Sequence, residues 1–531
     1  MKIVTAAEMR RVDALCAERY HISPTTLMEH AGTCVAEYLE RRYPDLARRQ
    51  IFVLCGKGNN GGDGLVAARL LHARGVPSTV IMISSFEGMR GDTATNLSRY
   101  QRSVGQVRLA RNSEEWERAK KGLEWAHLIV DSLLGTGLRG PADPLMAEVI
   151  GFVNQHRPDT EVISVDVPSG VNADTGEISG AAITADATVT FTAPKVGMML
   201  RPGSEHVGRL IVADIGSPHT LVEEASASRL RWIEPLEFDR LPLNRRPEAN
   251  KGTYGHSLII AGSRGKSGAA TMAGWAALRC GAGLVTVATP ESELAGVSAR
   301  VVELMTEPLS TTDIGSIGMR SLENGKFATL QKGKNVLAIG PGVTTHPETQ
   351  QVVREMVKQT ALPLILDADG LNAFAGRAGE LKDHAAPVMV LTPHPGEFAR
   401  LLGCGVAEVQ NDRLKLAQQA AAEWNLHVVL KGNQTVIAAP DGRAWINLTG
   451  NPGMATGGTG DVLTGMLAGL VAQFGEKNWE RALCMGVYLH GLAGDIAAEV
   501  KGEASLIATD VIEAIPQAYR RTLSITNRVD S

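Results

Sequence analysis

Short apolar runs that end in glycine-rich loops, with a helical pattern after them, organise the first half of this chain. Residues 51–55 (IFVLC) have the length of a buried strand, residues 56–64 (GKGNNGGDG) form a loop, and LVAARLLHARG continues with helical spacing. This order is typical of a phosphate- or nucleotide-binding strand-helix unit. Similar apolar runs predict strands at residues 78–83, 126–133, 161–167, 187–193 and 209–215. Such runs, with helices between several of them, indicate a parallel, doubly wound sheet covered on both faces.

The second half has the same kind of organisation. A strand at residues 258–262 leads into a glycine- and serine-rich loop and a helix of small residues, and later strands are expected at 284–289, 335–340, 363–369, 388–394 and 427–432. Between residues 215 and 250 this rhythm gives way to proline, serine and charged residues. We therefore expect two α/β domains, at residues 1–220 and 241–525, joined by a linker at 221–240.

The composition limits the classes of protein to which the chain can belong. Its 531 residues are too many for one ordinary core, and 44% hydrophobic with 21% charged residues suits a globular protein. A formal net charge of −4 without long basic runs argues against nucleic acid and anionic membranes as partners. The absence of a signal peptide and of a long apolar run predicts a cytoplasmic location. Six scattered cysteines without a CxxC pair predict reduced thiols.

Residues 451–461 (NPGMATGGTGD) form a glycine-rich motif that runs into the apolar helical pattern VLTGMLAGLVAQ. Such a loop can turn its free N–H groups toward an anion at the start of a helix. Asp461 stands at that start, where a carboxylate repels phosphate unless it serves as a base toward a hydroxyl group. The alternative is an aspartate that caps the helix. The motif alone leaves both interpretations open.

Polar residues follow several of the predicted strands. In the first half they are Asn59, Asn60, Asp63, Asp131, Asp166 and Ser169. Because ligands bind beyond the carboxyl ends of strands in open α/β sheets, these loops are expected to meet in one crevice. Asn60, Asp131 and Ser169 offer hard oxygen donors of low total charge, which suits a monovalent cation better than zinc. Each residue taken singly also fits a helix cap or a turn.

Two further side chains stand out in the second half. His394 lies in a strand-end loop and can face a ligand, although a lone histidine is more often structural. Lys431, with Thr435, lies just upstream of the glycine-rich motif and can contact a nucleotide phosphate. The alternative for this lysine is a solvated turn position.

Two sets of motifs resemble known families. GPG (340–342), TPHPGE (392–397), KG (431–432) and ATGGTGD (455–461) resemble the ADP/ATP-dependent NAD(P)H-hydrate dehydratases, which are ribokinase-like. GNNGGDG (58–64), VDSLLGTG (130–137) and VDVPSG (165–170) are similar to the NAD(P)H-hydrate epimerase domain. The resemblance implies a Rossmann-like N-terminal and a ribokinase-like C-terminal domain. It also implies repair of NADHX and NADPHX, in which water has added to C6 of the reduced nicotinamide ring.

For the second half the resemblance implies that Asp461 takes a hydroxyl proton while loop amides stabilise a transferring phosphoryl group. ADP would be the co-substrate, giving AMP and phosphate, with Mg²⁺ on its phosphates. The implied nucleotide site comprises Lys431, Gly432, Asn433, Gln434, Thr435, Asn451, Thr456, Gly457, Gly458, Thr459 and Gly460. The implied hydrate site comprises Gly342, His394, Pro395, Gly396, Glu397 and Asp461.

For the first half the resemblance implies interconversion of the two C6 epimers, which supplies the S form to the dehydratase. Asp166 is the candidate for proton transfer as hydroxyl leaves one face and water returns on the other. Asn60, Asp131 and Ser169 would hold K⁺. The implied dinucleotide site comprises Asn59, Asn60, Gly61, Gly62, Asp63, Gly135, Thr136, Gly137, Leu138, Arg139, Gly140, Pro141 and Asp166.

Two other functions remain open at this point. The second half can be a small-alcohol kinase, because fold does not fix substrate. The first half can be a non-catalytic interaction module, since similar domains occur in scaffold proteins. Ribokinase-like relatives often assemble, so a homo-oligomer is a further expectation, although the sequence reveals no interface.

Overall fold

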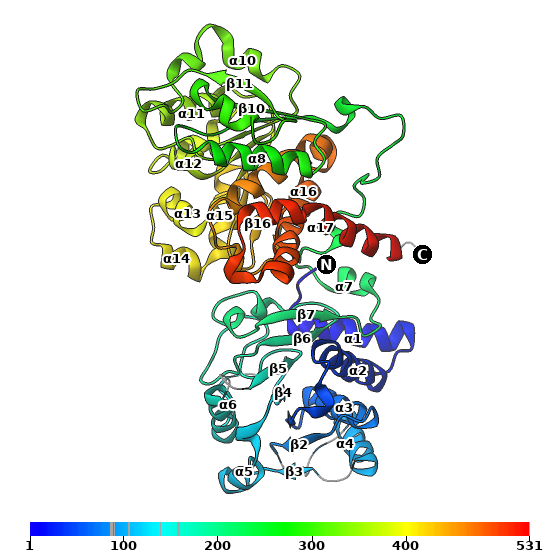
Figure 1. Ribbon diagram of the computed structural model, residues 1–531. Coiled ribbons are helices and arrows are strands. Elements are labelled where there is room, and N and C mark those ends of the chain that lie inside the picture. The colour runs from blue at the N-terminus through cyan, green and yellow to red at the C-terminus, as the bar shows by residue number, and fades with distance from the viewer. Residues whose placement is uncertain (85–88, 90, 105–106, 138–139, 157–159, 530–531) are drawn as a thin grey trace. The chain divides into compact units, whose positions relative to one another are not determined.

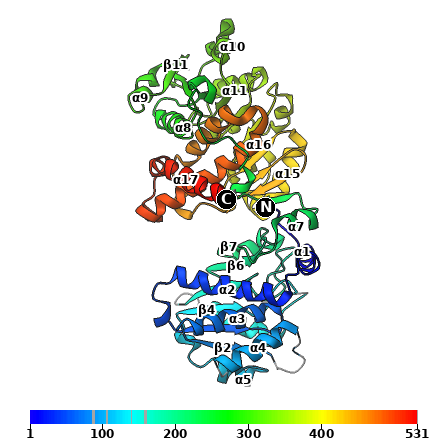
Figure 2. The ribbon, with the colours of Figure 1, turned by 90° about the vertical axis from the view of Figure 1, so that its right-hand side faces the viewer.

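The computed structural model describes residues 1–84, 89, 91–104, 107–137, 140–156 and 160–529. The chain divides into two compact units, Met1–Ser228 and Arg229–Ser531. In Figures 1 and 2 the first unit runs from blue to blue-green and the second from green to red. Each unit has its own sheet with helices packed against it, so the predicted α/β class is confirmed.

The sheet of the first unit has seven strands in the order β3-β2-β1-β4-β5-β6-β7, and every neighbouring pair is parallel. The strand order reverses between β1 and β4, as in Rossmann-like folds. The bounds are β1 Ile51–Cys55, β2 Ser78–Met82, β3 Arg108–Leu109, β4 Leu128–Ser132, β5 Glu161–Val165, β6 Ala187–Phe191 and β7 Arg209–Ala213. Only β3, two residues long, was not predicted, because so short a strand leaves no apolar run.

Helices cover both faces of this sheet because its strands are apolar on both sides. Phe52 and Leu54 of β1 join a core cluster with Trp116 and Ile150 from the α5–α6 side. Cys55 points to the other face, where α3 approaches so closely that a Cβ on Gly64 would lie 3.1 Å from the Cys55 Sγ. The helices are α1 Ala6–Tyr20, α2 Pro24–Arg42, α3 Asn59–Ala73, α4 Gly91–Ser103, α5 Ser113–Ala119, α6 Pro144–His156 and α7 His219–Ala225.

The sheet of the second unit has ten strands in the order β11-β10-β9-β12-β13-β14-β15-β16-β17-β8. The pairs from β11 to β15 are parallel, whereas β16 is antiparallel to both of its neighbours. The bounds are β8 Leu230–Trp232, β9 His256–Ile260, β10 Leu284–Pro290, β11 Met305–Leu309, β12 Val336–Ile339, β13 Leu364–Leu366, β14 Met389–Leu391, β15 His427–Leu430, β16 Val436–Ala438 and β17 Ala444–Ile446.

Four of these strands, β8, β11, β16 and β17, were not predicted. Three of them have only three residues, and β11 is largely exposed, so none shows a long buried run. The segment 221–240 that we expected to be a linker contains most of α7 and all of β8.

The long helix α16 (Thr459–Lys501) is the central helix of the second unit. It packs against α8 (Ser267–Arg279) and α17 (Ala508–Val529), and its helical geometry breaks at Asn478. Small residues allow this packing, since a Cβ on Gly465 would lie 1.9 Å from the carbonyl oxygen of Ala273. The other helices are α9 Leu294–Ser298, α10 Lys326–Gln331, α11 Pro347–Gln359, α12 Ala368–Asn372, α13 Pro395–Leu402, α14 Val406–Asn411 and α15 Arg413–Trp424.

Within the described ranges, no helix is both long enough and apolar enough to cross a bilayer.

Candidate active sites of the two units

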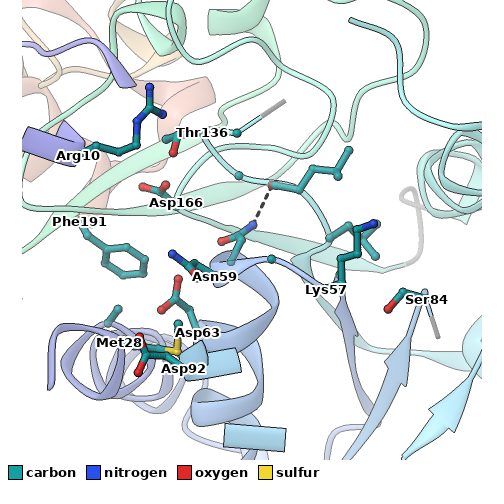
Figure 3. Close-up of a pocket in the computed structure, with 18 of the residues that line it drawn as sticks. Arg10, Met28, Lys57, Asn59, Asp63, Ser84, Asp92, Thr136, Asp166 and Phe191 are labelled. Carbon is teal, nitrogen blue, oxygen red and sulfur yellow. Dashed lines mark hydrogen bonds between the residues drawn. The ribbon is translucent and has the colours of Figure 1, made fainter. Parts of the chain in front are cut away.

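The first unit contains a cavity of about 1030 Å³ at the carboxyl ends of β1, β4 and β5 (Figure 3). It lies where the strand order reverses, the position at which doubly wound sheets bind their ligands. The loop after β1, the segment Leu133–Gly137 and Asp166 line it together with residues of α1 and α2. The structure therefore brings the polar strand ends of the first half into one crevice.

Most of the residues implied for the dinucleotide site line this cavity or lie directly behind its lining residues. Asn59, Asn60, Asp63, Gly135, Thr136, Gly137 and Asp166 line the cavity. Gly61 lies in the first turn of α3, where a Cβ would meet the Gly56 carbonyl oxygen at 1.9 Å, and a Cβ on Gly62 would meet Met28. Gly140 and Pro141 do not line the cavity, and Leu138 and Arg139 lie outside the described residues.

Asp166 follows β5 and has a backbone φ of +63°, a conformation that few non-glycine residues adopt, although aspartate adopts it more often than most. Its Oδ1 accepts a hydrogen bond from Nζ of Lys195 at 2.5 Å and another from the Thr190 hydroxyl at 3.1 Å. The Lys195 side chain is only 1% exposed. The cavity therefore holds a buried ion pair, of which the sequence had indicated only the aspartate.

Four more carboxyl groups line the same cavity, and burial raises the pKa of two of them, Asp13 on α1 and Asp63 on α3. Burial raises the pKa of Asp13 to about 6, while Lys195 lowers it and Asp166 raises it. Burial also raises the pKa of Asp63 well above its usual value, and the charges of Asp166 and Asp13 add to this. Asp13 was not singled out from the sequence, because an aspartate in an amphipathic helix carries no motif.

The three residues expected to hold K⁺ lie together, but they differ in how free their oxygens are. Both Asp131 oxygens accept hydrogen bonds, from the hydroxyls of Ser164 and Ser169 and from two backbone N–H groups. By contrast, Oδ1 of Asn60 is buried without a hydrogen-bond partner, while its Nδ2 donates to the Leu134 carbonyl at 2.8 Å. A buried, unpaired carbonyl oxygen suits a weakly held cation.

In the second unit Asp461 is the third residue of α16, and the cap of that helix is Gly458, with a φ of +95°. Within the described ranges no hydrogen bond or ion pair engages the Asp461 carboxylate, so it does not cap the helix. Burial raises its pKa to about 7, and the nearby charge of Asp367 contributes while Lys431 opposes. A carboxyl group poised in this way fits a general base.

Lys431 lies beside this aspartate and is tightly held. Its Nζ donates to Oδ1 of Asp367 at 2.6 Å and lies 3.8 Å from Oε2 of Glu397. A Cβ on Gly460 would lie 3.5 Å from the same Nζ, which places the ammonium next to the glycine-rich loop. Burial disfavours the charge, but Asp367 and Glu397 raise the Lys431 pKa overall. The alternative of a solvated turn lysine is therefore wrong.

Asp367 directly follows β13 and links this lysine to α16, and it was not singled out from the sequence. Its side chain is 1% exposed, and its Oδ2 accepts a hydrogen bond from the Thr464 hydroxyl at 2.6 Å. The motif DAD at the end of a predicted strand was a usable signal, because polar residues gather at such ends.

His394 has a local structural role, the alternative that the sequence had left open. Its Nδ1 accepts hydrogen bonds from the N–H groups of Gly396 and Glu397, and Glu397 in turn accepts one from the His394 N–H. These bonds cap α13, which begins at Pro395. Because Glu397 also approaches Lys431, the TPHPGE loop lies at the same site as Asp461.

Gly342 belongs to a second loop of the implied hydrate side. It has a φ of +67°, and a Cβ there would lie 3.1 Å from the Lys266 carbonyl oxygen. Nζ of Lys266 is in turn 3.4 Å from Oδ2 of Asp369, a carboxylate that raises the pKa of Asp461. The Gly342 loop is therefore close to the charged residues around Asp461.

The loop from Asn451 to Gly458 owes its shape to internal hydrogen bonds. Asn451 accepts a bond from the Gly453 N–H and donates to Asp495, and the Thr459 hydroxyl donates to the Met454 and Thr456 carbonyls. Gly457 has open space where a Cβ would stand. In residues 431–435, Gln434 has a φ of +55° and the Thr435 hydroxyl bonds the Gly432 carbonyl, while Asn433 is exposed.

Comparisons with known proteins match both halves of the chain. A family model described as NAD(P)H-hydrate dehydratase matches residues 257–517, and one described as YjeF-related protein N-terminus matches residues 24–197. The chain is 44% identical over 522 residues to the bifunctional NAD(P)H-hydrate repair enzyme Nnr of Moorella thermoacetica, covering 98% of this chain and 97% of that protein.

The Escherichia coli protein of the same name is 34% identical over 534 residues, covering 99% of this chain and 95% of its own. Among solved structures, the ADP/ATP-dependent NAD(P)H-hydrate dehydratase from Bacillus subtilis, co-crystallised with ATP and Mg²⁺, is 34% identical with a TM-score of 0.49. It covers 56% of this chain and 100% of that one. The sequence relatives extend across nearly the full length of the chain, which therefore belongs to the family of bifunctional NAD(P)H-hydrate repair enzymes.

Proposed function

We propose that this chain restores hydrated NADH and NADPH. The first unit interconverts the R and S epimers, and the second unit dehydrates the S form at the expense of ADP. The observation that carries the proposal is the Asp461 carboxyl group, which has no partner among the described residues and a pKa raised to about 7. It stands at the start of α16, directly after a glycine-rich loop.

Dehydration at C6 needs help because hydroxide is a poor leaving group. Asp461 takes the proton of the C6 hydroxyl while the β-phosphoryl group of ADP transfers to the C6 oxygen, leaving AMP. Lys431 and the N–H groups of the loop at Thr456–Gly460 supply the positive field that phosphoryl transfer requires. Phosphate then leaves with the bonding electrons, the N1 lone pair assists, and loss of a proton from C5 restores the double bond.

Epimerisation is supported by the cavity of the first unit. Its volume of about 1030 Å³ lies at the upper end of small-molecule sites, which suits a dinucleotide. Asp166 and Lys195 place a charged pair inside it. A non-catalytic interaction module has no need of a buried ion pair at a strained backbone position, since both are costly.

We also propose the two ions that the family implies. K⁺ would bind the free Oδ1 of Asn60 together with Ser169, while Asp131 holds the Ser169 hydroxyl in place. No group of three or more His, Cys, Asp or Glu side chains in the described part of the chain forms a metal cage. This fits Mg²⁺ that enters on the nucleotide phosphates and needs few protein ligands. We further propose that the protein is located in the cytoplasm and forms a homo-oligomer.

The test is recovery of the reduced nicotinamide absorbance from a mixture of R and S NADPH hydrate with Mg²⁺, K⁺ and either ADP or ATP. Full recovery from both epimers is expected with ADP. Replacing K⁺ by Na⁺ is expected to slow conversion of the R fraction only. Failure to recover any absorbance, together with a stable phosphate ester from a small alcohol, would instead establish the kinase alternative.

A further inference from the structure

Asp63 is a buried carboxyl group that the functions proposed above leave without a specific task. It is 9% exposed, and in the described part of the chain no hydrogen bond or ion pair reaches its oxygens. Figure 3 shows it rising from α3 into the cavity, toward the space that Asp166 enters from the loop after β5. Burying an unpaired polar group is costly, so such a residue is unusual in a fold that does not use it.

Burial is the main factor that favours the neutral form of Asp63. Five aspartates line the cavity, and two of them, Asp92 and Asp143, accept hydrogen bonds from the Thr25 hydroxyl and the Met146 N–H. The others are Asp13, Asp63 and Asp166, and Lys195 is a fully buried ammonium beside them. That ammonium contacts Asp166 at 2.5 Å and also binds the Thr190 hydroxyl and the Phe191 carbonyl. Asp166 thus has a cation in contact, whereas Asp63 has none. Burial raises the Asp63 pKa, the charges of Asp166 and Asp13 add to this, and the more distant Lys195 opposes them.

Inversion at C6 requires two groups of opposite protonation. The C6 hydroxyl sits on a carbon bonded to N1, so the nitrogen lone pair can expel it and form an N1=C6 double bond. The departing oxygen needs a proton, because hydroxide leaves poorly. Water that adds to the opposite face must lose a proton to a base, as in glycosidases that invert with one acid and one carboxylate.

We propose that Asp63 is the general acid of epimerisation and Asp166 its partner base, an inference that rests on the epimerase activity proposed above. Asp63 gives its proton to the C6 oxygen, the C6–O bond breaks, and water leaves with the bonding pair. A second water then forms a new C6–O bond from the other face, and the electrons of the double bond return to N1. Asp166 takes the released proton.

The step balances without any other reagent. One water leaves and one enters, nothing is oxidised or reduced, and the proton given by Asp63 equals the one received by Asp166. The carboxyl groups have exchanged protonation states, so the same site can run the reverse inversion with the roles swapped. Return of the proton through solvent resets the cavity for another turnover in the original direction.

The experiment uses the full chain without ADP, so that the second unit is idle, and follows R to S conversion by chromatography. Asp63→Asn is expected to lower kcat by about 100-fold with KM changed less than about 3-fold, because general acid–base groups contribute on that scale. Asp63→Glu, which keeps the acid, is expected to recover part of the rate. Asp214→Asn, an exposed carboxyl outside the cavity, is the matched control and is expected to keep the wild-type rate.

Isotope incorporation tests the bond that breaks. In H₂¹⁸O each inversion is expected to place one ¹⁸O on C6, whereas opening of the ring at the N1–C6 bond would retain the original oxygen. Retained oxygen, a kcat for Asp63→Asn above about a tenth of wild type, or a loss confined to KM would each overturn the assignment. A wild-type chain that never exceeds spontaneous epimerisation would instead overturn the proposed function. If Asp63→Asn does not fold, the glutamate variant and the isotope result decide.

Discussion

The two units hold their key carboxyl groups in different ways. In the first unit Asp166 is paired directly with a buried lysine, at 2.5 Å. In the second unit the buried lysine, Lys431, is paired instead with Asp367, and Asp461 stands beside that pair without a contact of its own. The cation in contact fixes the position of the Asp166 carboxylate. Asp461 stands beside a pair that is already neutralised, and burial raises its pKa to about 7. A raised pKa suits Asp461, which in the proposed mechanism must accept a proton at the moment of phosphoryl transfer.

The largest expected effect tests the unpaired carboxyl group. Asp461→Asn cannot accept a proton, so we expect dehydration of the S epimer to fall by about 10³-fold. Absorbance of restored NADPH with ADP and Mg²⁺ measures it. Conversion of R to S, which uses the other unit, serves as the internal control and is expected to stay at the wild-type rate. If the Asp461→Asn variant still dehydrates the S epimer at the wild-type rate, Asp461 is not the base. The contrast between the paired Asp166 and the unpaired Asp461 then has no bearing on the mechanism.

The next effect tests the paired carboxyl group. Lys195→Met leaves Asp166 buried without its cation, which is expected to lower epimerisation by about 100-fold and to destabilise the first unit by about 3 kcal/mol. Epimer chromatography and denaturant unfolding are the measurements. Lys195→Arg is the control, because it keeps the charge and is expected to retain most of the stability. Equal stability in the methionine variant would show that the ion pair is not what holds Asp166.

A smaller effect concerns the pH dependence of the second site. Asp461 must be ionised to act as a base, so kcat/KM for dehydration is expected to fall as the pH drops through about 7. Asp367→Asn removes a nearby negative charge and frees Lys431, and both changes lower the Asp461 pKa. In this variant we expect the acid limb of the kcat/KM profile for dehydration to move to lower pH by about one unit.

Asp369→Asn provides a graded comparison for this pH experiment. Asp369 also raises the Asp461 pKa but contributes less than Asp367. Its replacement is expected to move the acid limb in the same direction by a smaller amount. A limb that moves in neither variant would mean that another group limits the rate at low pH.

The smallest effect is on stability. The Asp461 pKa is raised in the folded chain, so the native state binds more protons than the unfolded state between pH 3.8 and about 7, and stability falls as the pH rises through that window. Asp461→Asn removes this cost. Allowing for solvent screening, we expect it to stabilise the second unit by about 1–2 kcal/mol at pH 8, and by less at pH 5. Denaturant midpoints at the two pH values measure the difference, and an equal gain at both would contradict it.

Several parts of the fold could be predicted because they depend on local patterns. The parallel strands such as β1 and β9 are buried on both faces, so their apolar runs are visible in the sequence. The short strands β16 and β17 were missed, because their pairing is decided by the strands next to them rather than by their own three residues. β16 pairs with β15 and β17, and β17 pairs with β16 and β8. Asp166 and Asp461 were found because each follows a recognisable strand-end or glycine-rich motif.

By itself, the sequence determined the two α/β units, the family, and Asp166 and Asp461, on which the proposed chemistry rests, since glycine-rich turns and apolar runs act over a few residues. Only the tertiary structure decided which charges meet. Lys195 lies 29 residues from Asp166 and Lys431 lies 64 residues from Asp367, and each pair forms because two different strands end at the same edge of a sheet. The protonation states of Asp63 and Asp461 depend on burial and on those neighbours, and these exist only once the chain has folded.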